Sequence, residues 1–159
     1  RAVSLESGKA CIKALKKVKY KVSSFDPKKK NFNLINKNKT DAIFNALHGK
    51  NGEDGIAQSY FEYLRIPYTH SGVISSYNAM NKIISKKIFQ QNKLLTPKYF
   101  TLNKNKASRS QIKKLLFSKK ISFPIVVKPI NEGSSLGVVI SRNVEDLFKK
   151  SKYLFKRFS

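Results

Sequence analysis

The sequence predicts an α/β protein made of two units, residues 1–95 with parallel strands and residues 96–159 with antiparallel strands. In the first unit, apolar runs of strand length alternate with helical patterns, which is the order of elements in parallel sheets covered by helices. In the second unit, two β-branched runs flank a loop of glycine and serine, as in a hairpin. Thr96-Pro97 separates the units, because proline cannot continue the helix that precedes it.

Apolar periodicity in the first unit predicts three helices and two strands. In chain order we expect a helix at 4–18, a strand at 20–25, a basic surface loop at 28–39, a buried parallel strand at 41–47, and helices at 56–64 and 75–92. Ser4 is the expected N-cap of the first helix. Asp54 is the expected cap of the helix that begins at Gly55, because short polar side chains accept the free amides at a helix start.

The second unit carries strand patterns on both sides of a helical one. In chain order we expect a strand at 99–102, a helix at 108–120, strands at 123–128 and 138–141, and a final helix at 144–158. The final helix is amphipathic, with Leu147, Lys150, Leu154 and Phe158 on one side.

The formal net charge of +24 raises the question of nucleic-acid binding. The basic residues are spread over the whole chain, and lysine outnumbers arginine by 28 to 5, whereas base and phosphate readers favour the forked guanidinium. No RNA-recognition or zinc-finger spacing accompanies them. We therefore expect no specific nucleic-acid partner, and a basic nucleic-acid-binding module remains the alternative of another class.

Three further features bound the class of protein. No apolar run approaches the roughly 18 residues that span a bilayer, so no membrane partner is expected. Cys11 is the only cysteine, which excludes an internal disulfide and favours a cytoplasmic location. The sequence begins at Arg1 rather than at methionine, so we expect it to be a fragment of a longer protein.

The stretch at 46–55 concentrates residue types that are scarce elsewhere in the chain. Both histidines, both adjacent acids and four of the 7 glycines lie between positions 48 and 72. The stretch joins the end of a predicted strand to the start of a helix, where α/β folds bind ligands. His48 either satisfies a loop carbonyl or contacts a ligand. Glu53 and Asp54 are more typical of helix-start residues than of metal ligands.

A second dense motif follows the strand at 123–128. Lys128 ends that strand, and a buried ammonium needs a charged partner, which a phosphate would supply. The loop at 132–137 can offer backbone amides and hydroxyls to an anion. The alternative is a lysine that reaches solvent beside an ordinary hairpin loop.

These motifs resemble the D-alanine–D-alanine ligase family. The run A-L-H-G-K-N-G-E-D-G at 46–55 and the run I-P-Y-T-H-S-G-V at 66–73 depart from the family pattern only at Asn51 and His70, where the family has glycine. R-A-V-S-L at 1–5 and M-N-K at 80–82 match with departures at Ala2 and Asn81. The spacing K-P-x-x-E-G-S-S-x-G at 128–137 matches as well. Asn51 is a mild departure, because asparagine tolerates the left-handed conformation.

The resemblance implies a fold and an activity. Residues 1–95 would form a truncated Rossmann-like (pre-ATP-grasp) N-terminal domain without its first strand, and residues 96–159 the small α+β central subdomain of an ATP-grasp fold. The complete enzyme would join two D-alanines with ATP through an acylphosphate, for peptidoglycan synthesis, as a cytoplasmic homodimer. Joining D-alanine to D-lactate, or another ATP-grasp ligation, is the alternative. The C-terminal ATP-grasp domain, with the ligands of Mg²⁺ or Mn²⁺, would be missing, so we expect no activity from these residues alone.

The resemblance also implies roles for individual residues. Val3, His48 and Ser134 would contact D-alanine, and His48 and Ser134 would be catalytic. The residues implied at ATP are Lys82, Lys128, Glu132, Gly133, Ser135 and Gly137. Val3 has an alternative role as a helix-entry residue packed in the core.

Overall fold

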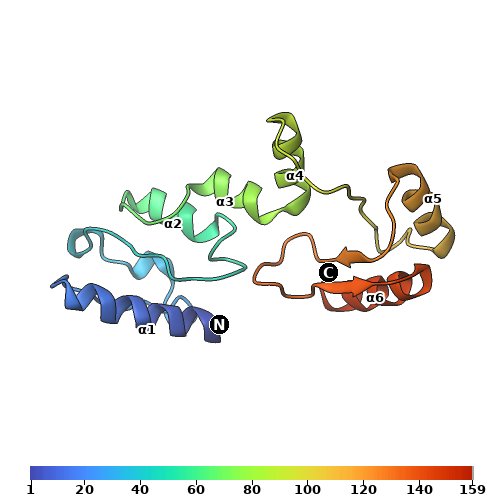
Figure 1. The fold of residues 1–159 in the computed structure, drawn as a ribbon. Helices are drawn as coiled ribbons and strands as arrows, with labels where there is room; N and C mark the ends of the chain where they lie inside the picture. Colours follow the sequence, from blue (N-terminus) through green and yellow to red (C-terminus); the bar gives the residue numbers. More distant parts are fainter. Residues whose placement is uncertain (159) are drawn as a thin grey trace. The chain divides into compact units, whose positions relative to one another are not determined.

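The computed structural model describes residues 1–158, and the chain divides into two compact units, Arg1–Lys82 and a second that begins at Ile83 (Figure 1). Helix α4, Lys82–Gln91, thus belongs almost entirely to the second unit, whereas the sequence places the domain boundary at 95/96. The hydrogen bonds of Lys86 explain why α4 groups with the second unit. Its Nζ donates to Thr96 Oγ1 at 2.6 Å and to the Pro97 carbonyl at 2.9 Å, which ties the helix to the segment that follows it.

The first unit contains three α-helices and two short 3₁₀ helices. They are α1 (Ala2–Lys17), η1 (Phe32–Leu34), η2 (Lys37–Lys39), α2 (Ile56–Leu64) and α3 (Val73–Met80). Figure 1 shows α1 along one side of this unit, with α2 and α3 along the other. The core is small: Ala57 and Phe61 of α2 and Ile66 are buried. Phe32, Tyr60 and Tyr68 surround this core, and the rings of Phe32 and Tyr68 contact that of Phe61.

Four expectations for the first unit are wrong or only partly met. Arg1, not Ser4, is the N-cap residue of α1, and Ser4 lies in the first helical turn. Residues 20–25 form no strand, because no described segment pairs with them. The expected strand at 41–47 shrinks to one parallel bridge between Ile43 and Tyr68. The helix expected at 75–92 is broken at Asn81, whose backbone is extended (φ −85°, ψ 106°).

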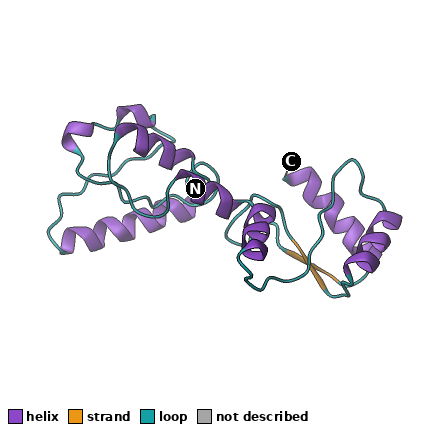
Figure 2. Ribbon diagram, turned by 90° about the horizontal axis from the view of Figure 1, so that it is seen from above, coloured by secondary structure: helices purple, strands orange, loops and turns teal. Residues whose placement is uncertain are grey.

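The second unit is a β-hairpin covered by helices, as its sequence predicts. Strands β1 (Ile125–Val127) and β2 (Val139–Ser141) pair antiparallel, with Val126 opposite Ile140 (Figure 2). Helix α6 (Val144–Arg157) packs on both strands and against α5 (Arg109–Lys119). The buried apolar side chains are Ile112, Leu147 and Leu154. The strand expected at 99–102 is absent from the described residues, again for want of a pairing partner.

The helices of the second unit begin at strong caps. The Asn143 side chain accepts the amide of Asp146 at 2.8 Å, and the Ser108 hydroxyl accepts the amide of Gln111 at 3.2 Å. Arg109 spans the two helices by pairing with Glu145 and lying over the ring of Phe148. These contacts fix α5 against α6.

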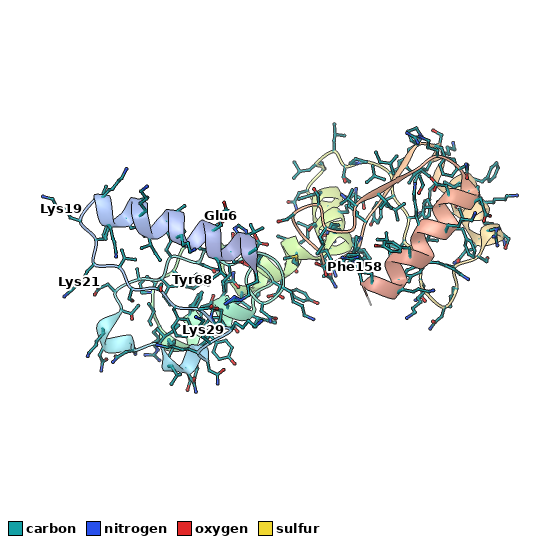
Figure 3. The ribbon with its side chains drawn as sticks, turned by 90° about the horizontal axis from the view of Figure 1, so that it is seen from below. Glu6, Lys19, Lys21, Lys29, Tyr68 and Phe158 are labelled. Atoms are coloured by element: carbon teal, nitrogen blue, oxygen red, sulfur yellow. The ribbon has the colours of Figure 1, made fainter. Side chains whose placement is uncertain are left out.

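Much of the chain remains exposed to solvent. The accessible surface is 12103 Å², whereas a compact monomer of this mass exposes about 8,100 Å². Helix α1 has no buried residue. Lysines account for much of the exposed surface, and Figure 3 shows Lys19 and Lys21 pointing away from the first unit. No helix among residues 1–158 has the length and apolar character needed to cross a membrane.

Candidate functional site

Two buried amide side chains fix the loop at 45–55 by hydrogen bonds. Asn45 Nδ2 and Gln58 Nε2 both donate to the carbonyl of Gly52, at 2.9 Å and 3.0 Å. Asn45 Oδ1 also accepts the amide of Leu47 at 3.1 Å. Because both amide side chains are buried, these bonds form in a region that excludes water and fix the loop firmly.

The turn itself uses left-handed backbone at three positions. Gly49, Asn51 and Gly55 have φ of +74°, +67° and +95°. Asn51 therefore adopts the left-handed conformation that asparagine tolerates. Asp54 Oδ2 accepts the amide of Asn51 at 2.8 Å, and its Oδ1 accepts the amide of Ile56 at 3.3 Å. Asp54 thus binds a first-turn amide as predicted, although Gly55 occupies the N-cap position.

His48 projects from this loop toward helix α1. Its Nε2 lies 3.0 Å from Ser7 Oγ, and its backbone amide donates to Ser4 Oγ at 3.1 Å. Its Nδ1 faces Glu53 Oε1 at 3.5 Å, while Glu53 Oε2 accepts the amide of Gly49 at 2.6 Å. Glu53 thus orients the loop and its histidine, whereas the sequence predicts a residue that serves the helix start.

The run at 66–73 closes this side of the unit. Tyr68 donates to Glu62 Oε1 at 2.7 Å, and burial together with this carboxylate raises the pKa of Tyr68 to about 12. His70 keeps the left-handed turn with φ of +79°, and its Nδ1 lies 2.8 Å from Thr69 Oγ1. His70 therefore has a left-handed backbone, the conformation that glycine adopts most easily.

Val3 lies in the first turn of α1, next to Ser4. Its side chain is 55% exposed, which excludes the alternative of a core residue. The first unit thus brings Val3, Ser4, Ser7, His48 and Glu53 to one region. Ser4 and Ser7 are absent from the sequence prediction of the site, and their spacing of three residues on a helix was the available signal.

The strand expected at 123–128 is shorter, Ile125–Val127, so Lys128 directly follows β1 instead of ending it, and the strand is not buried. Val126 is 56% exposed, and Lys128 itself is exposed. Because its ammonium group is not buried, Lys128 does not need a charged partner. What remains is its position at the start of the loop that carries Ser134 and Ser135.

The loop after Lys128 has an unusual backbone. Ser134, Ser135 and Gly137 all adopt left-handed φ, of +48°, +59° and +73°. A Cβ at Gly137 would lie 2.7 Å from the ring of Phe158 and 2.8 Å from Pro129, so only glycine fits there. Figure 3 shows Phe158 at the end of the chain segment that follows α6. Within residues 1–158, no acceptor pairs with the amides of Ser134 and Ser135, which leaves both amides available to an anion.

Lys86 is a cation of the second unit that the sequence prediction missed. It is half-buried, and its Nζ lies 4.9 Å from the centre of the Tyr99 ring. Burial lowers the pKa of Lys86, and the charge of Lys128 lowers it further. Lys86 and Lys128 are thus close enough to repel each other.

The expected site residues divide between the two units. Val3, His48 and Lys82 lie in the first, with Lys82 at its end. The remaining six, in the hairpin and its loop, are Lys128, Glu132, Gly133, Ser134, Ser135 and Gly137. No three His, Cys, Asp or Glu side chains in the described part of the chain lie together in a way that fits a metal ion.

Comparisons with known proteins match segments of both units. Residues 23–71 match the family model of the D-ala D-ala ligase N-terminus, and residues 88–158 that of the D-ala D-ala ligase C-terminus. A D-alanine–D-alanine ligase of Pelagibacter ubique is 54% identical over 140 residues, which are 88% of this chain and 45% of the relative. One of a Wolbachia from Brugia malayi is 43% identical over 149 residues, which are 94% of this chain and 42% of the relative. The chain thus spans less than half the length of these relatives.

Solved structures show the same likeness. A D-alanine–D-alanine ligase from Bacillus anthracis has a TM-score of 0.80 at 36% identity, covering 98% of this chain and 50% of that one. The same enzyme complexed with ATP has a TM-score of 0.78 at 32% identity, covering 99% and 51%. These matches define the class of protein: the chain contains the N-terminal and central parts of an ATP-grasp fold. Within that class, it belongs to the D-alanine–D-alanine ligase family.

Proposed function

We propose that this chain binds D-alanine and the phosphates of ATP in an ATP-dependent D-alanine–D-alanine ligase. One observation carries the proposal: the His48 loop is ordered by internal contacts in a chain 54% identical to a relative of that name. The names of the relatives support D-alanine, rather than D-lactate, as the second substrate. A cytoplasmic location and a homodimeric complete enzyme belong to the proposal and have family membership as their support.

The proposed reaction has two steps. ATP transfers its γ-phosphoryl group to a carboxylate oxygen of the first D-alanine, which gives an acylphosphate and ADP. The amine of the second D-alanine then attacks the acyl carbon, the tetrahedral intermediate expels phosphate, and the amine loses a proton. Catalysis of phosphoryl transfer depends mostly on positioning and on charge neutralisation.

The first unit would hold the first D-alanine. His48 would orient the substrate carboxylate from a loop whose backbone is fixed by Gly52 and Glu53. Val3 would contact the substrate methyl group, and its exposure leaves the side chain free to do so. In the second unit, the Ser134 hydroxyl would be a donor to D-alanine.

The second unit would hold the phosphates. Lys128 would neutralise phosphate charge. A second lysine proposed to contact ATP phosphates is Lys82, the first residue of α4. The backbone amide of Ser135 would donate to a phosphate from a left-handed turn, in a loop that also contains Gly133 and Gly137. Glu132 would hold this loop in place. The described residues do not fit Mg²⁺ or Mn²⁺, so no step is assigned to a metal on this chain.

A chimaera tests the proposal. This chain would replace the matching segment of the Pelagibacter ubique relative, and formation of the D-alanyl dipeptide and ADP would be measured. We expect ligation by the chimaera and a loss of ATP use in its Lys128→Met variant, with little change in Lys120→Met. Each variant removes one positive charge, but Lys120 is the C-cap of α5 and is not part of the loop. An inactive chimaera, or equal ATP kinetics in the two variants, would contradict the proposal.

A further inference from the structure

Two hydroxyl groups on one face of α1 meet the loop that carries His48. Ser4 and Ser7 are three residues apart, which places them on the same side of the helix. Ser4 Oγ accepts the backbone amide of His48, and Ser7 Oγ lies 3.0 Å from the ring Nε2. A Cβ at Gly8 would meet Ala46 Cβ at 3.9 Å, so helix and loop are in ordinary packing contact. The helix therefore binds both the backbone and the ring of His48.

The opposite side of the His48 ring faces a carboxylate. Glu53 Oε1 lies 3.5 Å from Nδ1, and its other oxygen is fixed by the amide of Gly49 at 2.6 Å. A carboxylate only accepts hydrogen bonds, so Glu53 favours the tautomer of His48 that has its proton on Nδ1. Ser7, His48 and Glu53 thus form a chain of hydroxyl, imidazole and carboxylate.

Ser7 Oγ lies at one ring nitrogen and Glu53 Oε1 faces the other, so both nitrogens have a polar neighbour within the protein. A serine hydroxyl has one hydrogen to donate and two lone pairs to accept with. When Nε2 also carries a proton, the ring donates to Ser7 Oγ, and the Ser7 hydrogen is released toward another acceptor. The His48 side chain is 38% exposed and Ser7 is half-buried, so a small solute reaches this group.

We propose that the Ser7 hydroxyl, rather than a ring nitrogen of His48, donates the hydrogen bond that binds the carboxylate of D-alanine. His48 is then a positioning residue that acts through Ser7, and Glu53 fixes the ring from behind. This inference rests on the proposed function, because it names the donor at that same D-alanine site. Carboxylate binding would turn the Ser7 hydrogen from Nε2 toward the ligand, while Ser7 Oγ stays beside the ring. Glu53 is the charged group that faces the ring, and α1 contributes the uncharged Ser4 and Ser7.

Nitrogen-15 NMR of the histidine rings in the 159-residue chain tests each step. The chain has two histidines, and a His70→Asn variant assigns their signals. Without ligand, Ser7→Ala should shift the Nε2 signal of His48. Ser59→Ala should leave that signal unchanged, because the Ser59 hydroxyl donates to the Ile56 carbonyl of its own helix at 2.7 Å.

D-alanine is then added, with D-alaninamide as the ligand that lacks the carboxylate. In the parent chain and in Ser7→Thr, D-alanine should shift the Nε2 signal of His48, because it changes the hydrogen bond with Ser7, and D-alaninamide should not. In Ser7→Ala the affinity for D-alanine should fall about tenfold or more, which is the effect of losing one hydrogen bond to a charged group. Glu53→Gln offers a second test that leaves Ser7 in place, and it should reduce the response of Nε2 to D-alanine.

The outcomes separate this inference from the function on which it rests. An unchanged Nε2 signal in ligand-free Ser7→Ala would overturn the hydroxyl–imidazole contact. Equal D-alanine affinity in Ser7→Ala and the parent would overturn the assignment of the donor and leave the proposed function standing. A parent chain that shows no response to D-alanine would contradict the proposed function, and this inference with it.

Discussion

Gly52 is the residue of the 45–55 loop at which a substitution should be most damaging. A Cβ on Gly52 would lie 2.4 Å from Leu47 Cβ and 3.1 Å from the carbonyl carbon of Leu47. Because the second atom belongs to the backbone, no side-chain rotation relieves the clash. The Gly52 carbonyl also accepts from the buried Asn45 and Gln58, so moving the backbone disturbs both bonds. Gly52→Ala therefore acts on packing and on hydrogen bonding together.

The expected loss of stability follows from these contacts. Overpacking costs about 1–3 kcal/mol, and each hydrogen bond to the Gly52 carbonyl contributes about 0.5–1.5 kcal/mol. Gly52→Ala should therefore lower the free energy of unfolding of the first unit by about 2–6 kcal/mol. A unit of this size has a total of only about 4–12 kcal/mol. The variant should unfold at a much lower urea concentration than the parent.

Gly49→Ala is the matched control. Gly49 has φ of +74°, and a Cβ added there would have no heavy atom within 4 Å, so the substitution adds backbone strain without a clash. That strain costs about 1–2 kcal/mol. Urea unfolding followed by the amide resonances of each unit separately would measure both variants. A Gly49→Ala loss equal to or larger than that of Gly52→Ala would refute the packing argument.

Three further predictions concern other parts of the chain. Folding raises the pKa of Tyr68 to about 12, so the protonated Tyr68 side chain stabilises the fold below pH 10. This stabilisation is lost as the pH rises toward 12. Glu62→Gln should lower that pKa, which tyrosinate absorbance would show. Asn143→Ala removes the side chain that accepts the Asp146 amide, so it should lower the free energy of unfolding of the second unit by about 1 kcal/mol. Urea unfolding would measure this, and an unchanged free energy would show that the cap does not stabilise the helix. The charge of +24 should give weak binding to DNA of any sequence that fades steeply with salt, and equal affinity at low and high salt would contradict this.

The helices follow from local sequence, whereas the strands do not. Residues 56–64 are predicted and observed as a helix with the same bounds, because the apolar stripe and the turn before it are both local signals. Residues 20–25 and 99–102 have strand-like composition, but a strand also needs a partner, which composition does not supply. The apolar periodicity does not predict the break at Asn81, because one extended residue leaves the apolar positions on either side nearly in phase.

The candidate site also has parts that the sequence predicts and parts that it does not. The Lys128 hairpin and the His48 loop follow from sequence, since each is a continuous run of residues. The contact between Ser7 and His48 joins positions 41 residues apart and depends on where α1 packs. The expected burial of Lys128 fails because β1 belongs to a two-stranded sheet with one face toward solvent. The sequence alone predicts where the site residues lie along the chain, but it does not predict which groups surround each side chain.

The large exposed surface of the chain has a thermodynamic consequence. From its mass, an extended chain would expose about 26,000 Å², so folding to 12103 Å² removes about 14,000 Å² from water. A compact protein of the same mass removes about 18,000 Å². The heat-capacity change and the denaturant m-value scale with this area, so both should be about four-fifths of the usual values. A calorimetric transition of this chain should accordingly be broad, and its stability curve should be flatter with temperature than the number of residues suggests.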